Sequence, residues 1–113
     1  MNTPLQAITI QDPVNKNHIK IDFIHLKKAT LTLRALNHKL RQQMIRLLDE
    51  HKKMTVTEIY IKLRLEQSVA SQHLAILRRA GIVATLRDGK FIHYAVNYKR
   101  LNELNNFVEQ LVG

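Results

Sequence analysis

The chain has 113 residues, enough for one domain with a single modest core. Its 18 Lys and Arg against 9 Asp and Glu give a formal net charge of +9, which favours polyanionic partners, nucleic acid first and acidic membrane second. There is no cysteine, which excludes disulfides, thiolate metal sites and cysteine nucleophiles, and no apolar run approaches the roughly 20 residues of a membrane helix.

The N-terminal segment differs in composition from the rest. Residues 1–18 hold both prolines, Pro4 and Pro13, and we predict a mobile arm there, in which residues 5–10 form at most a short strand. Residues 19–113 are expected to form one domain. The start of the chain lacks a basic and then apolar signal pattern, so we expect the protein to stay in the cytoplasm.

Two helices with no evident chemistry come next. Apolar periodicity predicts the first over residues 21–35, with Phe23 and Leu26 on its apolar side. The second is predicted from Asn37, as its N-cap, to about His51. Its apolar positions, which we expect to be buried, are Leu40, Met44, Leu47 and Leu48.

The next two helices are closely spaced. Thr55 and Glu58 have the spacing of a capping box, which opens a short helix over about residues 56–64. A turn at 64–66 leads to a helix that starts near Ser68 and ends at Gly81, a residue suited to the left-handed C′ position. Helical spacing turns its apolar residues toward the core: Ala70, Leu74 and Leu77.

The outward face of this helix has an unusual composition. A merely solvated face would carry Lys and Glu, but the opening turns carry short neutral side chains and glutamines. Gln can pair with adenine through two hydrogen bonds, Ser can serve any base, and Val can touch a thymine methyl. An arginine in the last turn suits phosphate. The residues predicted to contact DNA are Gln67, Ser68, Val69, Ser71, Gln72 and Arg78.

A hairpin follows the helix. Residues 82–86 and 91–96 read as strands, joined by an Asp-Gly pair that suits a tight turn. Arg87 and Lys90 flank that turn, where cations would meet backbone phosphates or the minor groove. A helix whose outward face carries short neutral side chains, followed by a basic hairpin, indicates a winged helix-turn-helix. We therefore predict a mainly α fold with about five helices and a small β-hairpin wing.

The last predicted helix is capped by Asn97 and bears an apolar stripe with little chain left to cover it. One interpretation is that the stripe packs only on its own domain. The other is a homodimer, formed by this helix together with the helix over 21–35, because two-fold proteins predominate among oligomers. The predicted dimer residues are Phe23, Leu26, Leu101, Leu104, Val108 and Leu111.

Residues 37–96 resemble the ArsR-type winged-helix transcriptional repressors. The resemblance rests on Ser68-Val69-Ala70-Ser71-Gln72-His73-Leu74-Ala75-Ile76-Leu77-Arg78, on Gly81-Ile82-Val83 after it, and on the wing sequence Asp88-Gly89-Lys90-Phe91-Ile92-His93-Tyr94. It implies a cytoplasmic homodimer that binds a roughly palindromic operator in double-stranded DNA and represses a nearby gene until a signal releases it.

The chain departs from that family at its sensor sites. Where many members place a Cys-x-Cys pair, this chain has Thr55 and Thr57, and hydroxyls do not replace thiolates for soft metals. A second family site uses Asp and His on the last helix, but residues 97–113 contain neither, and Glu103 and Glu109 alone do not build one. We therefore expect no metal and no cofactor, although His18 and His25, two helical turns apart, are a suggestive pair.

Three functions remain open at this point. The leading one is a dimeric repressor that binds double-stranded DNA, and the alternative is a winged-helix module for protein–protein contact. RNA binding is the third, disfavoured because aromatic residues for base stacking make up only 5% of the chain. An enzyme is not expected, since the chain has three glycines, no Gly-rich phosphate loop and no G-x-S-x-G motif.

Overall fold

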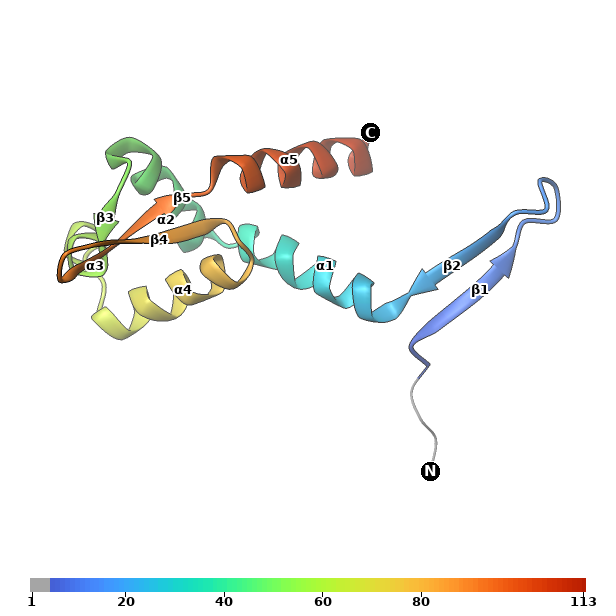
Figure 1. The fold of residues 1–113 in the computed structure, drawn as a ribbon, viewed down its shortest axis with the longest axis horizontal. Coiled ribbons are helices and arrows are strands. Elements are labelled where there is room, and N and C mark those ends of the chain that lie inside the picture. The colour runs from blue at the N-terminus through green and yellow to red at the C-terminus, as the bar shows by residue number, and fades with distance from the viewer. Residues whose placement is uncertain (1–4) are drawn as a thin grey trace, which may run out of the picture. The chain divides into compact units, whose positions relative to one another are not determined.

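The computed structural model describes residues 5–113 (Figure 1). The chain divides into two compact units, Met1–Thr32 and Leu33–Gly113. Within residues 5–113, none of the helices has the length and apolar character needed to cross a bilayer.

The first unit is built on a β-hairpin. Strand β1 (Ala7–Gln11) pairs antiparallel with β2 (His18–Asp22), and Ile10 lies opposite Ile19 in the register. Asp12 shapes the turn, because its Oδ1 accepts a hydrogen bond from the backbone N–H of Val14 at 2.9 Å. The predicted short strand near residues 5–10 is confirmed, but its partner strand was missed.

Helix α1 (Phe23–Leu36) follows the hairpin without a linker. It begins two residues later than predicted, because Ile21 and Asp22 are held in the β1–β2 ladder. The Asp22 Oδ1 atom accepts hydrogen bonds from the N–H groups of Ile24 and His25 at 3.0 and 3.1 Å, which satisfies two free donors of the first turn.

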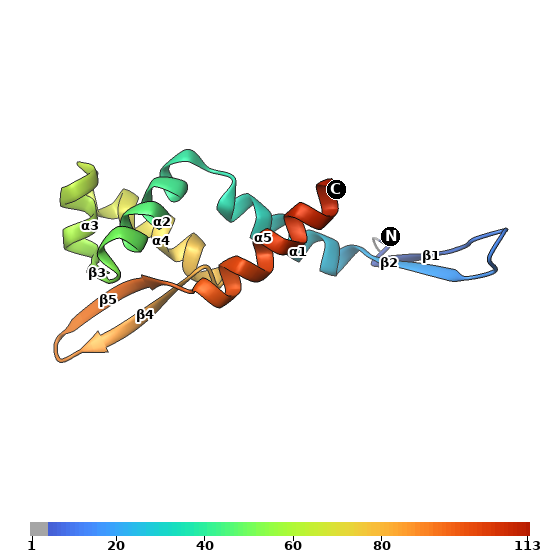
Figure 2. The same ribbon diagram turned by 90° about the horizontal axis from the view of Figure 1, so that it is seen from above.

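The second unit is a winged helix-turn-helix, as predicted, with a three-stranded antiparallel sheet in the order β3-β5-β4 (Figures 1 and 2). The sequence did not indicate β3, whose two residues are too few to show an alternating pattern. The elements of this unit that follow α1 are α2 (Lys39–His51), β3 (Met54–Thr55), α3 (Val56–Leu63), α4 (Gln67–Arg79), β4 (Val83–Asp88), β5 (Phe91–Val96) and α5 (Tyr98–Val112).

The core of the second unit is formed mainly by α2, α3 and α4, with contributions from the sheet and α5. The predicted inward residues of α2 and α4 are confirmed as buried, apart from Leu40, which is only partly buried against the core. Full burial of one such side chain contributes about 1.5–3 kcal/mol, so these positions hold the helices together. The largest fully buried side chains are Met44, Leu48, Ile59, Leu74, Leu77 and Ile82.

Three predicted helix boundaries are confirmed. Thr55 Oγ1 accepts from the N–H of Glu58 at 3.2 Å, and Glu58 Oε1 accepts from the N–H of Thr55 at 2.9 Å, which completes the capping box. Gly81 has a φ of 76°, the left-handed conformation expected after α4. Asn97 caps α5, its Oδ1 accepting from the N–H of Arg100 at 3.2 Å.

The predicted cap of α2 is wrong by one residue. His38, not Asn37, is the N-cap, and its Nδ1 accepts a hydrogen bond from the N–H of Leu40 at 3.2 Å. An imidazole nitrogen here accepts the capping hydrogen bond that a side-chain oxygen of Ser, Thr, Asp or Asn usually accepts. The sequence signal favoured asparagine because histidine is an uncommon cap.

Candidate nucleic-acid interface

Helix α4 exposes the side predicted to contact DNA, called here the reading face. Ala70, Leu74 and Leu77 are fully buried on one side of the helix, so the opposite side must face away from the core. The structure exposes four of the predicted contact residues of the opening turns and leaves Val69 half-buried. The four exposed residues are Gln67, Ser68, Ser71 and Gln72, and Arg78 in the last turn is exposed as well.

A tight turn sets the start of α4. Arg64, at the end of α3, has a left-handed backbone with a φ of 56°, and the N–H of Leu65 donates to the carbonyl of Tyr60 at 2.9 Å. The helix begins at Gln67, one residue before the predicted Ser68, and its N-cap Glu66 makes no capping hydrogen bond through its side chain. The first-turn N–H groups therefore remain available for water or for a phosphate oxygen.

The other end of α4 is tied to the wing. The N–H of Gly81 donates to the carbonyl of Arg78 at 2.9 Å, and the N–H of Ile82 donates to the carbonyl of Leu77 at 3.0 Å. Strand β4 follows at once, so α4 and the wing are joined by a single short turn (Figure 1). Their relative position is therefore set by backbone hydrogen bonds.

The wing is a regular β4–β5 hairpin, with Asp88 paired to Phe91 next to its turn. Arg87 and Lys90 are exposed at its tip, as predicted. The Lys90 Nζ atom lies 5.5 Å from the centroid of the Phe91 ring, and Arg87 Nε donates weakly to the Gly89 carbonyl at 3.4 Å. Sequence reasoning did not anticipate that the wing also exposes three large apolar side chains: Leu86, Phe91 and Ile92.

A buried arginine on α2 contacts α4 on its core-facing side. Arg41 on α2 is only 6% exposed, and its Nε and Nη2 atoms donate to the carbonyls of Ala35 and Arg34 at 2.7 and 2.9 Å. Its Nη1 atom lies 3.1 Å from Nδ1 of His73 on α4. This hydrogen bond joins α2 to α4. The role of Arg41 was missed, although a cation on the same helical side as Met44 was the available signal.

The pKa of His73 is lowered from its ordinary value. Burial is the main cause, and the neighbouring His38 ring and the Arg41 guanidinium add to it. The centroids of the His38 and His73 rings lie 4.8 Å apart. The surroundings of this imidazole on α4 therefore favour its neutral form.

The predicted dimer residues differ in how far they are exposed. Leu104 is buried within its own unit, so the structure removes it from any surface offered to a second copy. Leu101 and Val108 are half-buried, whereas Leu111 is 66% exposed. On α1, Phe23 is half-buried and Leu26 is exposed.

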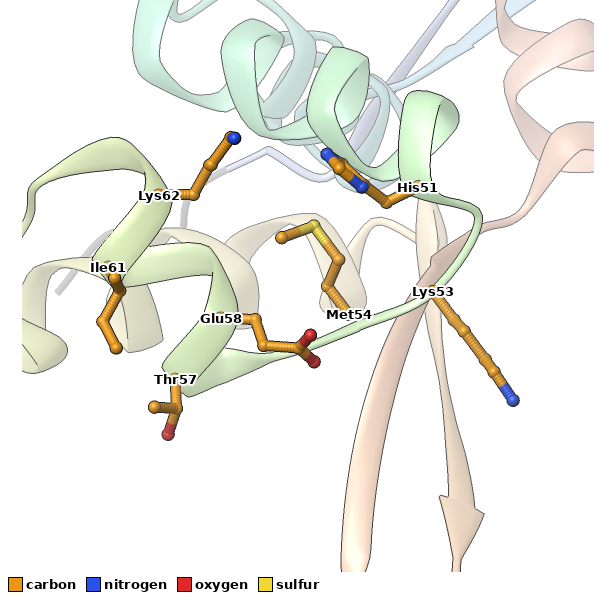
Figure 3. A pocket seen from close by; sticks show the side chains of 7 residues that line it. All are labelled: His51, Lys53, Met54, Thr57, Glu58, Ile61 and Lys62. Carbon is orange, nitrogen blue, oxygen red and sulfur yellow. The ribbon is translucent and has the colours of Figure 1, made fainter.

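A surface cavity of about 560 Å³ lies between the end of α2, β3 and α3 (Figure 3). The side chains of His51, Lys53 and Lys62 line it together with Glu58, but Lys53 points away from the others in Figure 3. The Glu58 carboxylate is already occupied by Thr55, whose hydrogen bonds also lower the pKa of that carboxyl group. The cavity therefore lacks a set of convergent free donors.

The residues at the sensor positions do not fit a metal. Thr55 is engaged in the capping box and Thr57 is an exposed hydroxyl, so neither supplies a thiolate. Across residues 5–113, no three His, Asp or Glu side chains lie close enough to share an ion. The suggestive histidines belong to different elements, His18 to β2 and His25 to α1.

Comparison with protein families identifies this helix-turn-helix. Residues 38–85 match the model described as "Bacterial regulatory protein, arsR family". The chain is 33% identical over 78 residues to the transcriptional repressor PagR of Bacillus anthracis, covering 69% of this chain and 78% of PagR. It is 31% identical over 84 residues to the transcriptional activator HlyU of Vibrio cholerae, covering 74% of this chain and 77% of HlyU.

Solved structures agree with the sequence matches. The crystal structure of PagR superposes with a TM-score of 0.60 at 28% identity, covering 80% of this chain and 99% of the PagR chain. The structure of HlyU from Vibrio cholerae superposes with a TM-score of 0.59 at 32% identity, covering 77% of this chain and 90% of the HlyU chain. About a fifth of this chain therefore lies outside the superposition, although the crystallised PagR chain is matched almost from end to end.

Proposed function

The chain belongs to the arsR family of bacterial regulatory proteins, and from that premise we propose that it is a cytoplasmic repressor that binds operator DNA as a homodimer. The single observation that carries the proposal is the exposed face of α4, with its small neutral residues and glutamines turned away from the core. Side chains of this kind let a helix approach base edges in the major groove.

The direction of regulation is the finer part of the proposal. Among the relatives, PagR is named a repressor and HlyU an activator. Repression needs only that the protein occupy its site and block access to it. Because this needs no contact beyond those with DNA, we favour repression.

A groove at the C-terminal end of α1 supports the homodimer. Its volume is about 500 Å³, and it is lined mainly by apolar side chains of α1 and α5. Two copies related by a two-fold axis would cover these side chains and place two α4 helices on one duplex. The lining residues are Leu33, Leu36, Asn37, Gln42, Leu101, Asn105, Val108 and Leu111.

One observation favours the alternative, a module for protein–protein contact. The wing exposes Leu86, Phe91 and Ile92 by half or more, and a wing that touches only phosphate has no need of them. The net charge of +9 and the uncharged reading face weigh more heavily for DNA.

Selection of bound fragments from the host genome, followed by titration over a salt series, tests the proposal. We expect one preferred palindromic site, two chains bound per site, and affinity that falls by about 10³-fold or more between 50 and 200 mM salt if six or more phosphates are contacted. Reporter expression from the selected site should rise when the gene for this protein is removed. Binding that shows neither sequence preference nor salt dependence contradicts the proposal.

A further inference from the structure

The described part of the first unit, from Leu5 to Thr32, has no core of its own. None of its side chains is buried, and the first buried residue among those that the structure describes is Ala35. This stretch holds seven of the fifteen large hydrophobic residues that are exposed within residues 5–113, and a two-stranded hairpin without cover is at best marginally stable. Something else must therefore cover it. The seven residues are Leu5, Ile10, Val14, Ile19, Ile24, Leu26 and Leu31.

The hairpin has two chemically different faces. Side chains alternate along each strand, and the register pairs isoleucine with isoleucine at two successive positions of one face. This isoleucine face consists of Ile8, Ile10, Ile19 and Ile21. The opposite face consists of Ala7, Thr9, Gln11, His18, Lys20 and Asp22. The charged residues of the two strands thus all lie on the opposite face.

The isoleucine face is fixed to α1. The N–H of Phe23 donates to the carbonyl of Gln6 at 2.7 Å, and Asp22 both ends β2 and caps the first turn of α1. No flexible linker separates hairpin from helix. Any partner that packs along α1, where Ile24 and Leu26 are exposed, therefore also meets the hairpin.

We propose that the isoleucine face docks on a second copy of this chain and so extends the dimer surface beyond α1 and α5. The inference rests on the homodimer of the proposed function. The first unit exposes seven apolar side chains by about half or more, and two of them, Ile10 and Ile19, belong to the isoleucine face. A standard interface involves about 20–30 residues on each side, whereas eight residues line the α1–α5 groove, so a stable dimer needs further surface.

Continuity and charge point to a second copy rather than to another protein. Helix α1 is unbroken from Phe23 to Leu36, and Leu33 and Leu36 in its last turns line the groove of the proposed dimer. The first unit carries four lysines against two aspartates, out of 18 and 9 in the whole chain, so two such units repel each other little. The excess positive charge lies in the second unit, where DNA is expected.

Single-cysteine labelling tests the contact, because the chain has no cysteine and the introduced thiol is the only one. Ile10→Cys lies on the isoleucine face, and Thr9→Cys next to it lies on the opposite face. Each variant is labelled with a thiol reagent below and above the dimer dissociation constant measured by sedimentation. We expect dimerisation to slow labelling of Ile10→Cys by about tenfold, the effect of about 1.4 kcal/mol of protection, and of Thr9→Cys by less than about twofold.

Three outcomes overturn the proposal, and they are distinguishable. If sedimentation shows a dimer while Ile10→Cys is labelled equally fast at both concentrations, the hairpin is not in the interface, although the dimer stands. If Ile10→Cys is protected even as a monomer, its own chain covers it. If the chain stays monomeric on the DNA as well, the homodimer itself fails.

Charge substitution provides a second measurement that does not depend on labelling. Ile10→Asp with Ile19→Asp should raise the dimer dissociation constant by at least about tenfold, because two carboxylates would be buried against the partner. Thr9→Asp with Gln11→Asp adds the same charge to the opposite face and should leave it within about twofold. Circular dichroism of both variants checks that the helices are intact. Equal dissociation constants for the two variants contradict the contact.

Discussion

Arg41 and His73 meet at 3.1 Å, between Nη1 of the guanidinium and Nδ1 of the imidazole. A guanidinium only donates, so Nδ1 must accept, which places the proton of the neutral ring on Nε2. The same arginine holds the carbonyls of Arg34 and Ala35 at the end of α1. Helix α4, which carries residues predicted to contact DNA, is thereby connected to the last turn of α1 through one buried cation.

This pair predicts a pH dependence of stability. The pKa of His73 is lowered in the folded protein, mainly by burial and then by His38 and Arg41. The unfolded chain therefore binds the proton more readily, and the stabilisation is complete above the ordinary value of about 6.5 and is lost as pH falls through the folded pKa. Urea unfolding at pH 7.5 and 5.5 should show a lower free energy of unfolding at 5.5.

The variant His73→Asn identifies the group responsible. Its side-chain oxygen can accept from Arg41 but does not titrate, so the difference between the two pH values should shrink. The exposed His18→Asn serves as the control and should leave the difference unchanged. A pH dependence that is the same in His73→Asn as in the unmodified protein would assign it to another histidine.

Arg41 itself should resist conservative replacement. The planar guanidinium of Arg41 reaches two carbonyls and an imidazole at once, and the ammonium group of a lysine cannot reproduce this geometry. Arg41→Lys should therefore lower the free energy of unfolding by about 1–3 kcal/mol. Arg46→Lys is the matched control on the same helix, because the Arg46 side chain is 85% exposed, and it should change stability by less than about 0.5 kcal/mol. Equal losses in urea unfolding would mean that the three contacts contribute nothing specific.

The winged helix could be predicted from sequence because its signals are local. The capping box at Thr55, the left-handed glycine at 81 and the cap at Asn97 each specify a boundary within a few residues. The outward face of α4 followed from helical spacing alone, since three buried residues fix the rest. Those parts of the site needed no knowledge of tertiary contacts.

The missed features depend on distant partners. Strand β3 exists only because Met54 and Thr55 pair with Tyr94 and His93, nearly 40 positions away in the chain. Arg41 is buried beside the end of α1, where it donates to the carbonyls of Arg34 and Ala35, and its own helix does not reveal these partners. Leu104 fits the periodicity of an exposed stripe and of a buried one equally well, so only the fold decides that it is buried.

Gly81 offers a test of the joint between α4 and the wing. Its φ is 76°, and an added Cβ would lie 3.5 Å from the Arg100 side chain, an ordinary contact. The cost of Gly81→Ala should therefore come from the backbone, about 1–2 kcal/mol in the free energy of unfolding. Gly81→Asn should cost less, since asparagine tolerates the left-handed region. If urea unfolding finds both variants equally destabilised, crowding rather than backbone strain limits this position.

Gln72 and Arg87 should affect DNA binding in different ways, because one is placed to read bases and the other to meet phosphates. Gln72→Ala should lose about 1–3 kcal/mol of discrimination at one base pair and leave the salt dependence unchanged. Arg87→Ala should weaken binding to all sequences alike and reduce the slope of log affinity against log salt by about 1. Fluorescence anisotropy with the selected operator and its single-base variants, over a potassium chloride series, measures both quantities. Gln43→Ala, an exposed glutamine on α2, controls for loss of an amide elsewhere. If Gln72→Ala and Arg87→Ala lower the affinity for every sequence by the same factor, α4 does not read bases through this face, and the contact with DNA is electrostatic alone.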